Sequence, residues 1–245
     1  MPYKAETIVP FSSDDSSKTI QVEQMFDAIA QRYDLLNHTL SFGIDKYWRK
    51  KGISALKNLS PRKILDVATG TGDLAMEACR ILRPAEILGI DLSEKMMEIG
   101  RQKAATAGWP EQIRFEQQNC MQLTLSDNTF DAAIVAFGVR NFENLNQGLQ
   151  EICRVLRPGG RLMILELTTP DTFPMKQLYR IYSSLIPAIG QVITRNQPAC
   201  NYLPKSIQAF PQFAEMARIL EKNGYSEVRF QKLTMGICGL YLATK

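Results

Sequence analysis

The spacing of apolar residues changes twice along this chain, and each change marks a different kind of predicted structure. From residue 19 the apolar positions lie three and four residues apart, which predicts an amphipathic helix. These positions are Met25, Phe26, Ile29, Tyr33, Leu36 and Leu40. A second helix is predicted from Ile44 to Leu59, ending before Pro61. We therefore expect residues 19–60 to form an N-terminal helical extension.

From residue 61 short apolar runs alternate with helix-like segments. Strands are predicted at Lys63–Val67, Ile87–Asp91, Ile113–Gln117, Ala132–Phe137 and Arg161–Leu167. Helices are predicted at Asp73–Leu82, Ser93–Ala107 and Leu145–Leu156, and Pro158-Gly-Gly160 is a turn signal that closes the last of them. This alternation predicts an α/β fold with a parallel, doubly wound sheet, whose core is residues 61–169.

The alternation stops after Pro170. The segment Phe173–Thr194 has a helical pattern and is unusually apolar, so residues 170–206 are expected to form an apolar helical insertion. This insertion either caps a binding site or forms a buried core helix. The domain is predicted to close, over residues 207–245, with a helix at Ile207–Asn223 and two more strands at Ser226–Lys232 and Gly239–Ala243.

The composition is that of an ordinary globular protein. Residues 19–245 are long enough for one domain with a substantial core, and residues 1–18 are expected to be a flexible lead because Ser12–Ser17 is polar. The net charge of +4 is too small to indicate a nucleic acid partner. The N-terminus lacks an apolar signal sequence and no apolar run is long enough to span a bilayer, so we expect a cytoplasmic protein.

Cysteine and histidine usage bears on redox state and metal binding. The five cysteines are scattered, without a Cys-x-x-Cys pair, and His38 is the single histidine. This pattern is typical of reduced thiols in a cytosolic protein, and it gives no ligand set for a metal site.

A glycine turn between the first strand and the first helix of the sheet carries the candidate chemistry. Asp66 lies in that strand, the turn is Gly70-Thr71-Gly72, and the next strand ends in Asp91. A βαβ unit of this kind places the turn and the second acid side by side at the carboxyl edge of the sheet, where an adenosine can lie. Because glycine has no Cβ, the backbone can approach a ligand closely. These five residues are therefore predicted to bind a nucleoside cofactor.

Two cofactors suit this turn. Gly70-Thr-Gly-Asp-Leu-Ala75 matches the dinucleotide pattern Gly-x-Gly-x-x-Ala, so a nicotinamide-dependent oxidoreductase is one alternative. However, Asp66 and Asp73 flank the turn, and two carboxylates suit a cationic ligand better than a pyrophosphate. S-adenosylmethionine, with a sulfonium and an ammonium group, is such a ligand. The remaining alternatives are a turn with a purely structural role and a catalytically silent nucleoside-binding or membrane-adaptor protein.

Two more segments follow strands at the same edge. Asn119 and Cys120 follow the third strand, where a side-chain amide and a backbone N–H suit the adenine edge; a simple asparagine turn is the alternative. Arg140 follows the fourth strand, in Phe137-Gly-Val-Arg-Asn141. Since ligands bind outside the carboxyl ends of such strands, we interpret Arg140 as directed into the crevice rather than lying at the surface.

Two longer segments resemble the signatures of the ubiquinone/menaquinone biosynthesis C-methyltransferase family. Tyr33-Asp-Leu-Leu-Asn-His-Thr-Leu-Ser-Phe-Gly43, with Trp48, is similar to the first signature, and Arg154-Val-Leu-Arg-Pro-Gly-Gly-Arg-Leu-Met-Ile-Leu-Glu-Leu-Thr168 to the second. Asp66–Asp73 and Phe137–Asn141 also match the family pattern, and the resemblance runs from about residue 19 to the C-terminus. It implies a class I S-adenosylmethionine-dependent methyltransferase fold with a mostly parallel seven-stranded sheet.

Carried over by position, the resemblance implies cofactor contacts for Thr71, Asp91, Asn119 and Cys120, and a catalytic role for Arg140. The chain also departs from the family pattern: Asp45 stands in place of a histidine, Leu36 of a methionine, Thr168 of a serine, and Ala136 of a serine that some members carry. The first departure excludes an essential imidazole base at that position, and none of the departures touches the βαβ unit.

The resemblance implies methylation of a ring carbon of a prenylated quinol, either demethylmenaquinol or a benzoquinol. This chemistry needs an electron-rich ring, so the substrate is the reduced quinol. Arginine stays protonated, so we interpret Arg140 as stabilising the developing phenolate or polarising a water that takes the proton. Tyr33 and Asn37 are predicted substrate contacts, with helix capping and packing as the alternative. His38 is either a proton acceptor or a solvated residue at a helix end.

The isoprenoid tail of such a substrate lies in the membrane, so we expect at most peripheral contact with the inner membrane face. The apolar segment Phe173–Thr194 is suited to admit the tail. Lys46-Tyr-Trp-Arg-Lys-Lys51 pairs aromatic residues with cations, which suits either an anionic lipid surface or a solvated helix face. The oligomeric state stays open, with a homodimer as one option.

Overall fold

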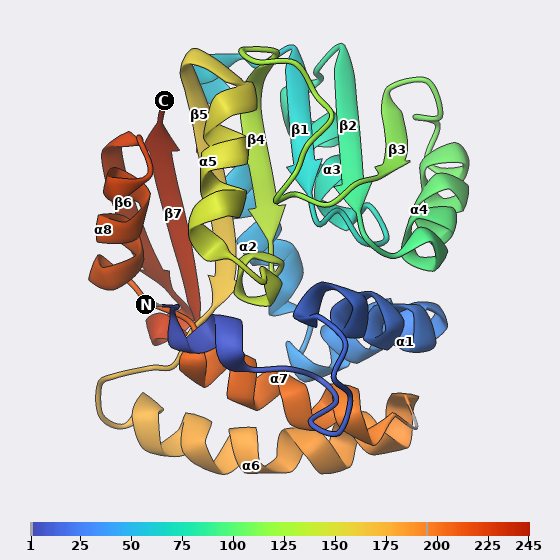
Figure 1. Cartoon of the computed structure of the whole chain (residues 1–245), viewed down its shortest axis with the longest axis vertical. Coiled ribbons are helices and arrows are strands. Elements are labelled where there is room, and N and C mark those ends of the chain that lie inside the picture. Colours follow the sequence, from blue (N-terminus) through green and yellow to red (C-terminus); the bar gives the residue numbers. More distant parts are fainter. Residues whose placement is uncertain (1, 195) are drawn as a thin grey trace.

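Seven strands form one sheet in the computed structural model, which describes residues 2–194 and 196–245 (Figure 1). The strands are β1 (Lys63–Val67), β2 (Glu86–Asp91), β3 (Ile113–Gln117), β4 (Phe130–Ala136), β5 (Leu156–Leu167), β6 (Ser226–Leu233) and β7 (Cys238–Thr244). Their order is β3-β2-β1-β4-β5-β7-β6. β1 to β5 are parallel, and β7 is antiparallel to both of its neighbours. The predicted mostly parallel, seven-stranded sheet is confirmed.

Helices cover both faces of the sheet and its carboxyl edge. They are α1 (Lys18–Leu40), α2 (Ile44–Ser54), α3 (Asp73–Leu82), α4 (Glu94–Thr106), α5 (Leu145–Val155), α6 (Met175–Thr194), α7 (Gln197–Ala209) and α8 (Ala214–Lys222). Short 3-10 turns lie at Lys4–Thr7, Lys57–Leu59, Val139–Asn141 and Thr234–Gly236. In the described part of the chain, no helix is both long and apolar enough to cross a membrane.

The core lies in two layers, one on each face of the sheet. Side chains alternate between the faces along a strand, so Leu65 and Val67 pack on the side of α5 and α8, whereas Ile64 packs on the side of α2 and α3. All three are fully buried. Burial of one such side chain contributes about 1.5–3 kcal/mol, which fixes both helical layers against the sheet.

α1, α6 and α7 lie across the edge of the sheet at which the parallel strands end (Figure 1). Met25 and Ile29, one turn apart on α1, pack against Ala199 and Tyr202 of α7. The N-terminal extension and the apolar insertion, far apart in sequence, thus form one roof over the carboxyl edge.

The single helix predicted over Ile207–Asn223 is wrong. α7 ends at Ala209, Phe210 is extended (φ −66°, ψ 134°), and α8 begins only at Ala214. Pro211 favours this break, because its ring disfavours the helical conformation at the residue before it.

β5 begins earlier than predicted. It starts at Leu156 rather than Arg161, and its pairing with β4 shifts register across Pro158–Gly160. Gly159 has φ +77°, a conformation that favours glycine. The Pro-Gly-Gly segment is therefore an irregularity inside the strand, while α5 ends at Val155.

Residues 2–17 run beside α5 and the start of α1. Ser12–Asp15 belongs to the polar run from which a flexible lead was expected, and it is exposed. Ala5 and Pro10 are buried. The Glu6 carboxylate accepts a hydrogen bond from the backbone N–H of Leu145 (2.7 Å), which ties this segment to the start of α5.

Candidate active site

The turn after β1 and the acid that ends β2 meet at the carboxyl edge of the sheet. The backbone N–H of Gly70 donates to Asp91 Oδ2 (2.8 Å), and that of Ser93 donates to Asp91 Oδ1 (2.9 Å). Gly70 and Gly72 have φ of +55° and +77°, and a Cβ on Gly72 would lie 3.0 Å from the ring of Phe115. The juxtaposition predicted from the sequence is therefore present, and the turn requires its glycines.

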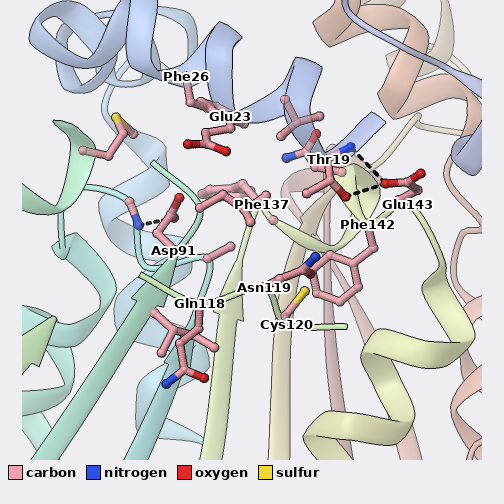
Figure 2. A pocket seen from close by; sticks show the side chains of 18 of the residues that line it. Thr19, Glu23, Phe26, Asp91, Gln118, Asn119, Cys120, Phe137, Phe142 and Glu143 are labelled. Atoms are coloured by element: carbon pink, nitrogen blue, oxygen red, sulfur yellow. Dashed lines mark hydrogen bonds between the residues drawn. The ribbon is translucent and has the colours of Figure 1, made fainter. Parts of the chain in front are cut away.

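A first cavity, of about 690 Å³, lies directly outside this turn (Figure 2). Asp91, Asn119 and Cys120 line it from the strand ends, and Glu23 and Phe26 of α1 line it from the opposite side. Four of the residues predicted to bind a cofactor, the three at the strand ends and Gly70, are thus brought together around one cavity.

Asn119 and Cys120 present different chemistry to the first cavity. Asn119 Oδ1 accepts a hydrogen bond from the N–H of Met121 (3.0 Å), so the asparagine turn considered from the sequence is also present. Burial raises the pKa of the Cys120 thiol to about 12, so this side chain stays protonated and forms an apolar wall.

A second, smaller cavity of about 330 Å³ adjoins the first. Tyr33, Gly70 and Phe137 line both cavities, and Asp66 and Thr71 line the second only. Asp66, Gly70 and Thr71 therefore border the second cavity as predicted, whereas Gly72 borders neither cavity.

Asp66 gives the second cavity an acidic wall. Its Oδ2 accepts a hydrogen bond from the hydroxyl of Thr69 (2.7 Å), while its Oδ1 is buried without a partner among the described residues. Burial raises the pKa of Asp66 to about 7; the Thr69 hydrogen bond lowers it and the charge of Asp91 raises it further. An ammonium group of a ligand would complete the hydrogen bonding of this carboxylate and favour its ionised form. The site therefore fits a cationic ligand.

Thr71 connects the turn to two helices. Its hydroxyl donates to Asp34 Oδ1 of α1 (2.6 Å) and accepts from Lys103 Nζ of α4 (3.1 Å). Lys103 Nζ also pairs with Asp34 (2.7 Å) and with Asp73 (2.5 Å). Thr71 thus fastens α1 over the turn in addition to lining the second cavity.

A third cavity, of about 580 Å³, lies among α1, α2, α6 and α7. Most of its lining is apolar or aromatic: Leu40, Trp48, Leu167, Tyr179, Tyr182, Ile186, Leu203, Ile207 and Ile237. Its polar side chains are Asn37, Ser41, Asp45 and Arg140. Phe137 lines all three cavities, so they lie around this one residue.

Arg140 is paired with Glu166, a residue that the sequence reasoning did not single out. Arg140 Nη1 donates to Glu166 Oε1 (2.6 Å) and to the carbonyl oxygen of Phe137 (2.5 Å). Burial lowers the pKa of Arg140, but Glu166, Tyr33 and Tyr202 together outweigh this and hold it above the ordinary value. The sequence did contain a signal for this pair: Glu166 lies within the apolar run Met163–Leu167, and a buried acid is rarely left unpaired.

The two predicted substrate residues line different cavities. Tyr33 borders the first and second cavities, and Asn37 borders the third. Burial raises the pKa of the Tyr33 hydroxyl, and a hydrogen bond with Asn37 lowers it. The pair therefore lies at the boundary between the turn and the third cavity.

The cationic cluster Lys46–Lys51 is only partly at the surface. Trp48 and Arg49 are 3% and 7% exposed. Arg49 is paired with Asp45, and the Nδ1 of His38 lies 2.9 Å from the same carboxylate. Two of the six residues that suggested a lipid surface are therefore buried, and one of those two belongs to an internal charge network.

Of the two cofactors that the sequence left open, the buried Asp66 favours the cationic one. A pyrophosphate there would meet a carboxylate with a bare oxygen, whereas an ammonium group would satisfy it. The sheet resembles that of a solved S-adenosylmethionine-dependent methyltransferase of Thermotoga maritima, with a TM-score of 0.63 at 18% identity over 91% of this chain and 99% of that one. Fold and site together define a class I S-adenosylmethionine-dependent methyltransferase.

The chain belongs to the ubiE/COQ5 methyltransferase family, whose sequence model matches residues 14–245. A demethylmenaquinone methyltransferase of Bacteroides fragilis is 53% identical over 246 residues, covering 100% of both chains. Another, of Porphyromonas gingivalis, is 44% identical over 242 residues, covering 98% of each. Family membership confirms the predicted methyl donor, S-adenosyl-L-methionine, over the nicotinamide alternative.

Proposed function

We propose that this chain methylates a ring carbon of demethylmenaquinol to give menaquinol. Two relatives that match nearly the whole chain carry the name of this activity. The observation that carries the proposal is the third cavity, because its apolar and aromatic lining suits a quinol ring and it shares Phe137 with both cofactor cavities. A prenylated benzoquinol is the alternative substrate.

Each candidate residue has a place in this proposal. Asp91 holds the ribose hydroxyls, and Asn119 and Cys120 border the adenine. The methionine end lies in the second cavity, against Asp66, Gly70 and Thr71, and Gly72 holds the turn that shapes this cavity. Tyr33 and Asn37 orient the quinol where the cavities meet.

The side chains around the third cavity must make the ring carbon nucleophilic. S-adenosyl-L-methionine supplies an electrophilic methyl group on a sulfonium sulfur. Arg140 stabilises negative charge on the quinol oxygen, and its effect is strong because the apolar walls exclude water. The same walls hold the ring at a fixed distance from the donor, which removes much of the entropic cost of bringing the two together.

The quinones of a strain lacking this chain test the substrate assignment. Demethylmenaquinone should accumulate and menaquinone should disappear, and a plasmid carrying the chain should reverse both changes. Accumulation of a demethylated benzoquinone would instead support the alternative substrate. An unchanged quinone profile would contradict both.

Affinity for S-adenosyl-L-methionine is expected to rise with pH. Asp66, with a pKa raised to about 7, is neutral in the free protein below that pH, and only its ionised form attracts an ammonium group. The dissociation constant should fall about tenfold between pH 5.5 and pH 7. Calorimetry across this range checks it. The Asp66→Asn variant should bind weakly and without this slope; a slope that persists in the variant would assign it to another group.

We also infer peripheral membrane contact through α6. The inner side of this helix lines the third cavity with Tyr179, Tyr182 and Ile186. Its other side carries the exposed apolar residues Leu178, Ile181, Leu185 and Val192. Phe173, just before the helix, is also exposed. The helix also carries Lys176 and Arg180 and no acidic residue. This combination suits the surface of an anionic bilayer, beside the cavity that receives the quinol.

Replacing Leu178, Ile181 and Leu185 together by glutamine should lower sedimentation with anionic vesicles about tenfold, because three apolar side chains no longer enter the interface. Turnover with a short-tailed, water-soluble quinol should stay unchanged. Replacing Lys46, Lys50 and Lys51 by glutamine tests the α2 surface separately. Loss of sedimentation only in the lysine variant would move the contact from α6 to α2.

A further inference from the structure

Aromatic methylation releases one proton, and the group that accepts it faces the third cavity. Arg140 cannot accept a proton because its guanidinium stays charged. Glu166 is fully buried and holds Arg140. A second acceptor is therefore needed within hydrogen-bond reach of the quinol hydroxyl.

Asp45 is the only acid among the described residues that line the third cavity. It is 2% exposed, and its Oδ1 accepts a hydrogen bond from the hydroxyl of Ser41 (2.6 Å), which lines the same cavity. Burial raises the pKa of Asp45, but Ser41, Arg49 and His38 outweigh that effect, so the pKa is lowered. Asp45 therefore faces the quinol as a carboxylate.

His38 connects this carboxylate to the exterior. Its Nδ1 lies 2.9 Å from Asp45 Oδ2, and its Nε2 lies 3.9 Å from Asp73 Oδ2. The imidazole is 31% exposed and lines an outer groove of about 1590 Å³, together with Lys46, Lys50 and Lys103. Asp45 and His38 thus span the wall between the third cavity and the outer groove.

We infer that Asp45 accepts the phenolic proton of the quinol and that His38 passes it to water in the outer groove. The assignment rests on the proposed function and names its proton acceptor. It gives separate tasks to the two polar ends of the cavity: Arg140 stabilises the phenolate, and the Asp45–His38 pair removes the proton.

The step balances as follows. Starting from the Nε2–H tautomer of His38, whose Nδ1 is free to accept, the phenolic O–H bond breaks and its proton moves to Asp45, then to Nδ1 of His38, and the imidazolium releases its Nε2 proton to groove water. Exchange with groove water then returns His38 to the Nε2–H tautomer. The ring carbon forms the new C–C bond as the C–S bond breaks, with that electron pair remaining on sulfur. The ring carbon then loses its hydrogen as a proton, which returns to the ring oxygen. One proton is released for each methyl group transferred.

A purely structural role is the competing explanation. Asp45 and Arg49 form an ion pair one turn apart on α2, and Arg49 also lies 3.6 Å from Asp73. In that case Asp45 and His38 would only hold α1 and α2 together. A missing structural contact cannot be replaced by a small base in solution, whereas a missing proton carrier can.

The test is chemical rescue of His38→Ala, whose side chain faces the groove. Turnover of reduced demethylmenaquinol, followed as S-adenosylhomocysteine, should fall at least about tenfold, with unchanged melting temperature and affinity for S-adenosyl-L-methionine. Imidazole should restore much of this rate, and the more basic 4-methylimidazole should restore more. Turnover of the Asp45→Asn variant should fall about 100-fold, and imidazole should not restore it, because the asparagine amide cannot accept the proton.

Lys50→Ala, which removes another exposed side chain of the outer groove, is the matched control and should turn over like the wild type. If turnover of His38→Ala stays within twofold of the wild type, or if imidazoles do not restore it, the proton-acceptor assignment is overturned and the proposed function is not affected. An inactive wild type would contradict the proposed function itself.

Discussion

Replacing Arg140 with alanine is expected to lower turnover about 100- to 1000-fold while leaving the dissociation constant for S-adenosyl-L-methionine nearly unchanged. Removing one preorganised group that stabilises developing charge typically has an effect of this size. Arg140 lines the third cavity and does not border the first or second among the residues described there. Single-turnover kinetics and calorimetry measure the two quantities. An equal loss of both would refute its assigned role.

The same change should also destabilise the fold, because it leaves Glu166 as an unpaired charge that is 0% exposed. Breaking a buried ion pair from one side costs about 3–5 kcal/mol. The double variant Arg140→Met with Glu166→Gln removes both charges and should recover most of the stability without recovering turnover. Denaturant unfolding and turnover, measured together, separate the two effects. Recovery of turnover in the double variant would show that Arg140 acts through the fold alone.

Replacing Asp91 with alanine should weaken binding of S-adenosyl-L-methionine about 100-fold or more. Its carboxylate accepts hydrogen bonds from the N–H groups of Gly70 and Ser93. It also lines the first cavity, where it can accept hydrogen bonds from two ribose hydroxyls. Hydrogen bonds to charged groups are each worth about 1.5–3 kcal/mol, and the glycine turn also loses an anchor. Calorimetry with S-adenosylhomocysteine, which shares the ribose, should show the same loss.

Glu98→Gln is a matched control for Asp91, because it neutralises an exposed acid on the outer side of α4. It should bind the cofactor like the wild type. If Asp91→Ala binds S-adenosyl-L-methionine with unchanged affinity, Asp91 does not hold the ribose.

The sheet and the cofactor edge were predictable from the sequence because both follow from local periodicity. The runs Lys63–Val67 and Ile113–Gln117 match their strands residue for residue, and the turn between β1 and α3 brings Gly70 against Asp91 as expected. Parallel strands with crossover helices leave little choice in where their carboxyl ends meet. The chemistry at that edge could therefore be located before the fold was known.

The substrate side of the site was harder to predict from the sequence, because it depends on contacts between segments far apart in the chain. Glu166 acquires its role only through Arg140, 26 residues away, and Asp45 through its place beside His38 in the third cavity. The split of the last predicted helix at Pro211 had a local signal, since proline disfavours the helical region at the residue before it. The continuous apolar pattern across Phe210 concealed it.

Transfer of a deuterated methyl group tests the central claim most directly. Purified protein is incubated with S-adenosyl-L-methionine carrying a CD3 group and with demethylmenaquinol kept reduced, and the products are analysed by mass spectrometry and NMR. The account predicts one CD3 group on a ring carbon for each S-adenosylhomocysteine formed, and no transfer to the oxidised quinone. A CD3 group on oxygen, or no S-adenosylhomocysteine from the reduced quinol, would contradict it.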